Sequence, residues 1–117
     1  PDYAVTGVQT CALPISMGVY SGWAKVDENW YKTMVNIGVR PTLNLKNLAI
    51  ESHLIGFEGS LYGRTISLHL HEKIRSEMRF ASLQLLKEQL EKDKRSTIKS
   101  LDTLNYTPNK NDFLIFE

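Results

Sequence analysis

The sequence is poor in cysteine, in net charge and in long hydrophobic runs. Cys11 is the single cysteine among 117 residues, so neither a disulfide within the chain nor a cysteine metal cluster can form. Fourteen basic and thirteen acidic residues leave a net charge of +1, which is too small to imply nucleic acid or an acidic membrane as a partner. No apolar run approaches the ~18 residues that span a bilayer. We therefore expect a soluble chain that suits the reducing cytoplasm.

The first sixteen residues differ from the rest of the chain. Residues 5–16, VTGVQTCALPIS, show no sustained period of 2 or 3.6, and no basic segment precedes them as it would in a secretory signal. They resemble the translation of a sequencing adaptor. We therefore expect residues 1–16 to be a non-native or disordered leader, residues 17–105 to be one domain, and residues 106–117 to be a tail.

A period of two begins at Gly18 and predicts a hairpin. Residues 18–26 (GVYSGWAKV) and 30–38 (WYKTMVNIG) are rich in β-branched and aromatic residues, and polar turn residues lie between them. Pro41 has no backbone donor and pushes Arg40 toward extended geometry. We therefore expect the second strand to end before Pro41, with a loop that runs to about Lys46.

Two further strands and a helix follow. Residues 48–57 and 64–72 read as strands, and the second of them alternates cleanly, with His69 and His71 on its polar face. Four successive antiparallel strands indicate a small barrel or sandwich. Residues 81–101 change to a helical period, with Ser82 as the N-cap and one apolar stripe. The stripe contains Leu83, Leu86, Leu90, Thr97 and Leu101.

Glu51 is the sharpest candidate for chemistry. Residues two apart in a strand share a face, so Glu51 and His53 project together. A carboxylate within an apolar strand is costly to bury unless it is paired or used. The residues alone leave a structural glutamate at the barrel rim as an alternative. His69 and His71 could share a metal, but no third ligand is spaced with them, so we assign no metal site and expect a solvated polar face.

Four short patches occur in a specific order. They are NIGVRPT at residues 36–42, the Glu51-x-His53 triplet, LYG at residues 61–63, and the R-x-E-x-x-F run of Arg75, Glu77 and Phe80. Together they resemble the riboflavin kinase domain of bacterial bifunctional riboflavin kinase/FMN adenylyltransferases, also called FAD synthetases. The resemblance implies a small antiparallel Greek-key barrel with a carboxyl-terminal helix. It also implies a cytoplasmic enzyme that transfers the γ-phosphate of magnesium-bound ATP to the 5′-hydroxyl of riboflavin, giving FMN.

The resemblance also implies roles for individual residues. Glu51 corresponds to the catalytic base, and Leu54 and Tyr62 to residues beside the nucleotide. Three more residues correspond to the flavin-binding group: Arg75, Met78 and Phe80. The implied partners are small molecules, ATP and riboflavin, with no nucleic acid and no membrane. Mg²⁺ accompanies ATP, and no residue is assigned as a metal ligand.

Part of the family pattern has no counterpart in the chain. The family carries a glycine-bearing loop and a Pro-Thr-Ala-Asn element upstream of the strand that matches residues 18–26. The leader occupies their place, and Pro41 to Asn44 belongs to the later Arg-Pro-Thr patch. We therefore expect a riboflavin kinase domain truncated at its amino terminus, without the adenylyltransferase domain and with impaired turnover. Two alternatives remain open: a flavin-binding module without catalysis, and an oligonucleotide-binding barrel that stacks bases on Trp23, Trp30 and Tyr31.

Overall fold

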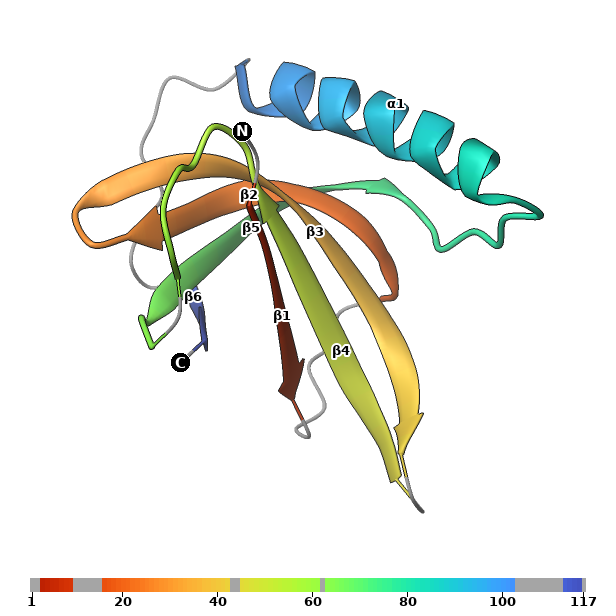
Figure 1. The fold of residues 1–117 in the computed structure, drawn as a ribbon, viewed down its shortest axis with the longest axis horizontal. Coiled ribbons are helices and arrows are strands. Elements are labelled where there is room, and N and C mark those ends of the chain that lie inside the picture. The colour runs from red at the N-terminus through yellow and green to blue at the C-terminus, as the bar shows by residue number, and fades with distance from the viewer. Residues whose placement is uncertain (1–2, 10–15, 43–44, 62, 103–112, 117) are drawn as a thin grey trace.

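The described part of the chain contains six strands and one helix. The computed structural model describes residues 3–9, 16–42, 45–61, 63–102 and 113–116. The predicted class, mainly β with a helix after the main strands, is confirmed (Figure 1). The elements are β1 (Tyr3–Gln9), β2 (Gly18–Val26), β3 (Asn29–Thr42), β4 (Leu45–Leu54), β5 (Ile66–Arg75), α1 (Leu83–Asp102) and β6 (Phe113–Phe116).

The strands form one curved antiparallel sheet in the order β1-β4-β3-β2-β5-β6 (Figure 1). Strands β2, β3 and β4 are neighbours in sequence and in the sheet, and β5 returns to lie beside β2. This order is that of a Greek key. Among the described strands, β1 and β6 each have one partner and form the two edges, so the barrel is incomplete there.

The predicted hairpin of residues 18–38 is confirmed, but its second strand is longer than expected. Strand β2 pairs with β3 from Val26 opposite Asn29 to Gly18 opposite Ile37. Beyond Ile37, β3 has β4 as its partner, and the pairing continues through Pro41 opposite Lys46. The expectation that the strand ends before Pro41 is therefore wrong. Proline is tolerated here because this part of β3 has a neighbour on one side only, as at a sheet edge.

The hydrophobic core lies on one face of the curved sheet. The core consists of alternate residues of the strands, which point to the same face of the sheet, and of residues from the segment between β4 and β5. They are Ala24, Val26, Val35, Ile37, Ile50, Leu54, Phe57, Leu61, Ile66 and Leu68. In β2, β3 and β4, the residues that alternate with the core residues lie on the outer face of the sheet, on the side where Figure 1 shows α1. Val19, Met34 and Glu51 are among the residues on this outer face.

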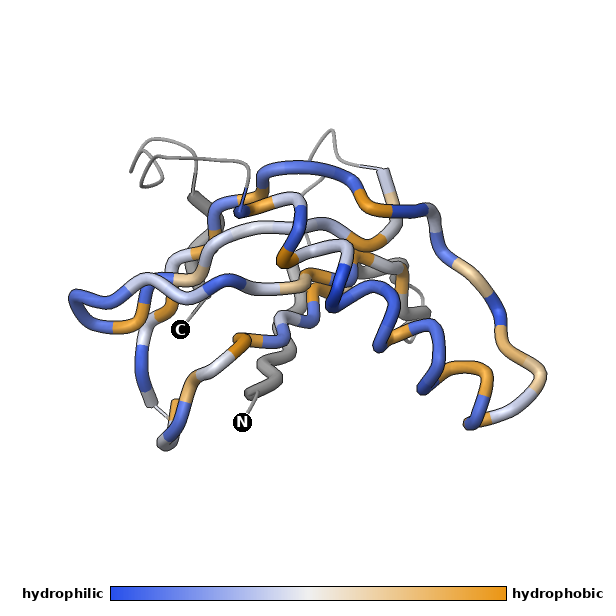
Figure 2. The backbone as a smooth tube through the Cα atoms, turned by 90° about the horizontal axis from the view of Figure 1, so that it is seen from above, coloured by the Kyte–Doolittle hydropathy of each residue, from blue (hydrophilic) through white to orange (hydrophobic). Residues whose placement is uncertain are grey.

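Helix α1 lies across β2, β3 and β5, and its residues alternate between hydrophilic and hydrophobic (Figure 2). The predicted N-cap is confirmed, because the Leu85 amide donates to Ser82 Oγ at 3.2 Å. Thr97 and Leu101 are buried as expected, whereas Leu83 is 75% exposed. The expected burial of Leu83 is therefore wrong. The first turn of α1 extends past the sheet in Figure 1, so no strand lies beneath it.

The two ends of the described chain supply the edge strands. Strand β1 pairs with β4 from Tyr3 opposite Leu54 to Gln9 opposite Leu48. The leader therefore contributes a backbone edge strand, while residues 10–15, including Cys11, lie outside the described residues. Strand β6, within the tail, pairs with residues 66–69 of β5. The assignment of residues 1–16 as non-native stays a prediction.

Candidate flavin-binding and phosphoryl-transfer site

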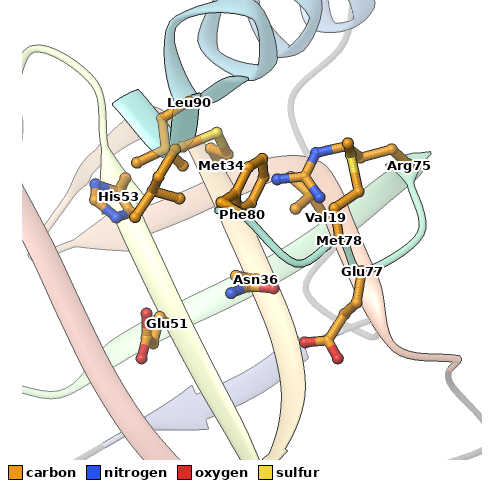
Figure 3. Close-up of a pocket in the computed structure, with 11 residues that line it drawn as sticks. Val19, Met34, Asn36, Glu51, His53, Arg75, Glu77, Met78, Phe80 and Leu90 are labelled. Atoms are coloured by element: carbon orange, nitrogen blue, oxygen red, sulfur yellow. The ribbon is translucent and has the colours of Figure 1, made fainter. Parts of the chain in front are cut away.

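A cavity of about 300 Å³ lies between the outward face of the sheet, the loop after β5 and helix α1 (Figure 3). It is apolar toward the helix and polar toward the lower part of β3 and β4. The residues that line it are Val19, Met34, Asn36, Glu51, His53, Arg75, Glu77, Met78, Phe80, Leu86 and Leu90. Four of the six residues predicted for the site therefore meet at one cavity: Glu51, Arg75, Met78 and Phe80.

Strand β4 places Glu51 and His53 in the cavity wall. The two residues share the outward face of the strand, as their spacing predicts. Glu51 lies opposite Asn36 of β3, and His53 lies opposite Met34. Both side chains are half-buried. In Figure 3 the Asn36 side chain lies between the carboxylates of Glu51 and Glu77. One end of the cavity therefore has both hydrogen-bond donors and hydrogen-bond acceptors.

Arg75 ends strand β5 and is tied to the helix. Its Nε donates to both carboxylate oxygens of Asp93, at 2.9 and 3.0 Å, and its Nη2 donates to Asp93 Oδ2 at 2.7 Å. Its Nη1 donates to the Ser76 carbonyl at 3.0 Å. Two of its five N–H groups are left without a partner in the described part of the chain. The side chain is 16% exposed and lines the cavity.

Met78 and Phe80 come from the loop between β5 and α1, which we call the 76–80 loop. Met78 is 51% exposed, and Phe80 is half-buried. The Arg75 guanidinium carbon lies 5.9 Å from the centre of the Phe80 ring. A flat aromatic face beside a planar cation and a soft thioether suits a large planar ligand.

Glycine at position 38 makes room for another side chain of the same loop. A Cβ at Gly38 would lie 2.5 Å from Glu77 Oε1. The carboxylate of Glu77 therefore rests directly against the backbone of β3. Asn36, Gly38 and Glu77 belong to the sequence motifs, but the motifs alone predict no role for them. Asn36 could have been found from the alternation of β3, which puts it on the same face of the sheet as Met34. The contact between Gly38 and Glu77 joins two elements and is not visible in any local sequence pattern.

Of the two predicted nucleotide residues, the structure describes only Leu54, and it does not line the cavity. Leu54 is fully buried in the hydrophobic core, so its side chain is not accessible to a ligand. Tyr62 lies outside the described residues. Their roles beside the nucleotide stay predictions.

His69 is buried, with 6% of its surface exposed, so the expectation of a solvated polar face is wrong for this residue. Strand β5 lies between β2 and β6, and His69 is opposite Trp23 on one side and Phe113 on the other. It is therefore not on a sheet edge. Within the described ranges, no group of three His, Cys, Asp or Glu residues is arranged to hold a metal ion. No helix in this part of the chain is long and apolar enough to cross a membrane.

Three curated relatives are similar to the chain. The bifunctional riboflavin kinase/FMN adenylyltransferase of Pseudomonas fluorescens is 42% identical over 65% of this chain and 25% of its own length. The enzyme of the same name from Bacillus subtilis is 37% identical over 86% of this chain and 33% of its own length. The RNA-binding riboflavin kinase of Bacillus subtilis is 36% identical over 84% of this chain and 44% of its own length. The chain thus spans less than half the length of each.

A solved structure shares the fold. It is the macrolide-efflux protein from Streptococcus pneumoniae, with a TM-score of 0.66 and 24% sequence identity, covering 78% of this chain and 28% of that protein. The riboflavin kinase family model matches residues 5–101, a range that begins inside the predicted leader. The match covers most of the chain. The chain belongs to the riboflavin kinase family.

Proposed function

We propose that the chain carries the riboflavin site of a riboflavin kinase, which transfers the γ-phosphate of ATP to the ribityl 5′-hydroxyl of riboflavin to give FMN. One observation carries the proposal: a single cavity has an apolar and aromatic side, formed by the 76–80 loop and α1, and a carboxylate at the other side from Glu51. Riboflavin has the matching form, a planar ring system joined to a chain of hydroxyl groups.

The ring system would lie at the apolar side of the cavity. Phe80 offers a π-face, Met78 offers soft packing, and the two remaining N–H groups of Arg75 offer hydrogen bonds to ring oxygens or nitrogens. The ribityl chain would then extend along the outward face of β3 and β4. There Asn36 and Glu77 supply groups that hydrogen-bond to hydroxyls.

Glu51 would act as the general base. As the terminal ribityl oxygen attacks the γ-phosphorus, the bond from that phosphorus to the β–γ bridging oxygen breaks and ADP leaves. The hydroxyl proton passes to the Glu51 carboxylate. Phosphoryl transfer has a loose transition state, so placing the hydroxyl in line with the phosphate matters more than strong basicity.

The nucleotide side of the reaction rests on the family resemblance. ATP would arrive with Mg²⁺ as its counter-ion, and Leu54 and Tyr62 would lie beside the nucleotide. The described residues offer no cluster of metal ligands, so we derive no step through a protein-bound metal. The partners proposed for the chain are therefore ATP and riboflavin.

An oligonucleotide-binding surface is not favoured by the arrangement of the aromatic side chains. Trp30 and Tyr31 are adjacent in a strand and face opposite sides of the sheet. Tyr31 packs edge-to-face on Phe57 of the core, with ring centres 5.2 Å apart, and Lys25 lies over Trp30 at 5.7 Å. The three aromatic residues therefore do not form one stacking platform.

Titration with riboflavin and FMN tests the proposal independently of turnover. We expect saturable quenching of flavin fluorescence by this chain, and no comparable binding of a single-stranded oligonucleotide. ATP-dependent formation of FMN then separates an enzyme from a flavin-binding module without catalysis. Absence of flavin binding by the folded chain would contradict the proposed function.

A further inference from the structure

Asp93 is a buried carboxylate that the proposed reaction does not use. It lies within α1, its side chain is 2% exposed, and it does not line the cavity. Besides the three hydrogen bonds from Arg75, it accepts one from Gln89 Nε2 at 3.0 Å. Burying a charge this completely is unfavourable unless the charge is paired and hydrogen-bonded. Within the described part of the chain, Asp93 therefore accepts hydrogen bonds from Arg75 and from the preceding turn of its own helix.

The pairing fixes the plane of the guanidinium group. Nε and Nη2 engage the two carboxylate oxygens together, and such a two-pronged arrangement defines orientation as well as distance. With that side held, Nη1 reaches the carbonyl of Ser76, the first residue of the 76–80 loop. The same guanidinium lies beside the Phe80 ring at the end of the loop. Asp93 is thus connected through Arg75 to both ends of the loop.

We propose that Asp93 is a positioning residue for flavin recognition: its carboxylate holds the Arg75 guanidinium against Phe80 and leaves the two unpaired N–H groups aimed at the cavity. The proposal rests on the proposed function, because it concerns the affinity of the same cavity for flavin. It differs from a purely structural tie between β5 and α1. A structural tie would change stability without a specific change at Phe80 or in flavin affinity.

Asp93→Asn tests the proposal, because it keeps the shape of the side chain and removes its charge. We expect the dissociation constant for FMN to rise about tenfold, as when a charge-assisted hydrogen bond is lost. In an Arg75→Ala background the same change should have little further effect on affinity, because the two residues act as a unit. Glu91→Gln is the matched control, since it removes an exposed carboxylate from the same helix. It should leave FMN affinity unchanged.

A second readout does not depend on flavin binding. In NMR spectra of the chain without ligand, the Arg75 Nε–H should exchange slowly with water, and Asp93→Asn should speed that exchange and shift the Phe80 ring signals. If the parental chain binds no flavin, the proposed function fails, and these signals still decide the role of Asp93. Parental affinity in Asp93→Asn, or unchanged Arg75 and Phe80 signals, would overturn the proposal.

Gln89→Ala covers the case in which Asp93→Asn does not fold. It removes one hydrogen bond from Asp93 and leaves both charges of the ion pair in place. We expect FMN affinity to fall by about two- to threefold, which corresponds to the lower end of a single hydrogen bond. Faster exchange of the Arg75 Nε–H should accompany the loss. Parental values for both quantities in a folded Gln89→Ala variant would likewise overturn the proposal.

Discussion

At the scale of single residues, the cavity combines a half-buried carboxylate with an apolar, aromatic wall. The period of two predicted that Glu51 and His53 share a face, and the motif placed Arg75, Met78 and Phe80 together. Asp93 could not be found in the same way. A helical stripe is recognised by its apolar members, and an aspartate among Glu91, Lys92 and Lys94 reads as exposed. Its burial depends on Arg75, which is 18 residues away in sequence.

Glu51→Gln tests the catalytic assignment. The amide retains the size and a hydrogen-bond acceptor but cannot take a proton, so we expect kcat to fall by about 10²-fold or more, with flavin affinity within about twofold. Glu58→Gln, which changes an exposed glutamate in the turn after β4, is the control. If this chain is inactive, the pair is compared after an upstream segment from the Bacillus subtilis enzyme is joined to it. Parental turnover in Glu51→Gln would make the residue structural.

Gly38→Ala tests the contact between β3 and the 76–80 loop. The added methyl group would meet the Glu77 carboxylate, so the loop must move away from β3. We expect flavin affinity to fall several-fold, by roughly 1 kcal/mol, the scale of one lost contact or hydrogen bond. Fluorescence titration measures it. In a Glu77→Ala background, Gly38→Ala should cause little further loss, and an equal loss in both backgrounds would contradict the account.

At the scale of elements, local patterns predicted the hairpin of β2 and β3 and the start of α1. The errors arose where tertiary neighbours decide the outcome. Pro41 is tolerated because the pairing of β2 with β3 stops at Ile37, so this part of β3 has a neighbour on one side only. Leu83 is exposed because no strand lies beneath the first helical turn. His69 lies opposite Trp23 of β2 and Phe113 of β6, so it is inside the sheet and not at its edge. None of these neighbours can be identified from residues close in sequence.

The N-cap of α1 gives a stability test. Ser82 Oγ accepts from the Leu85 amide, and Ser82→Ala leaves that amide to water. We expect the free energy of unfolding to fall by about 1 kcal/mol, measured by urea denaturation. Ser96→Ala, at an exposed position within the helix, is the control and should be neutral or slightly stabilising. Equal values for the two variants would show that the cap contributes nothing.

At the scale of the whole molecule, the sheet has two edges, and residues 3–9 cover one of them by pairing with β4. Deleting residues 1–16 would expose the backbone of β4 along that edge, and unpaired edges promote association. We expect the shortened chain to form dimers or larger species at concentrations where the parental chain is monomeric. Size-exclusion chromatography with light scattering measures this. A monomeric shortened chain with parental stability would show that β1 is dispensable.

The central claim is that flavin binds in the cavity between Glu51 and the 76–80 loop, and backbone amide NMR during a riboflavin titration tests it most directly. The account predicts saturable shifts concentrated at Asn36, Glu51, Met78 and Phe80, with Trp23 and Trp30 on the same sheet little changed. Absence of saturable shifts, or shifts centred on Trp23 and Trp30, would contradict it.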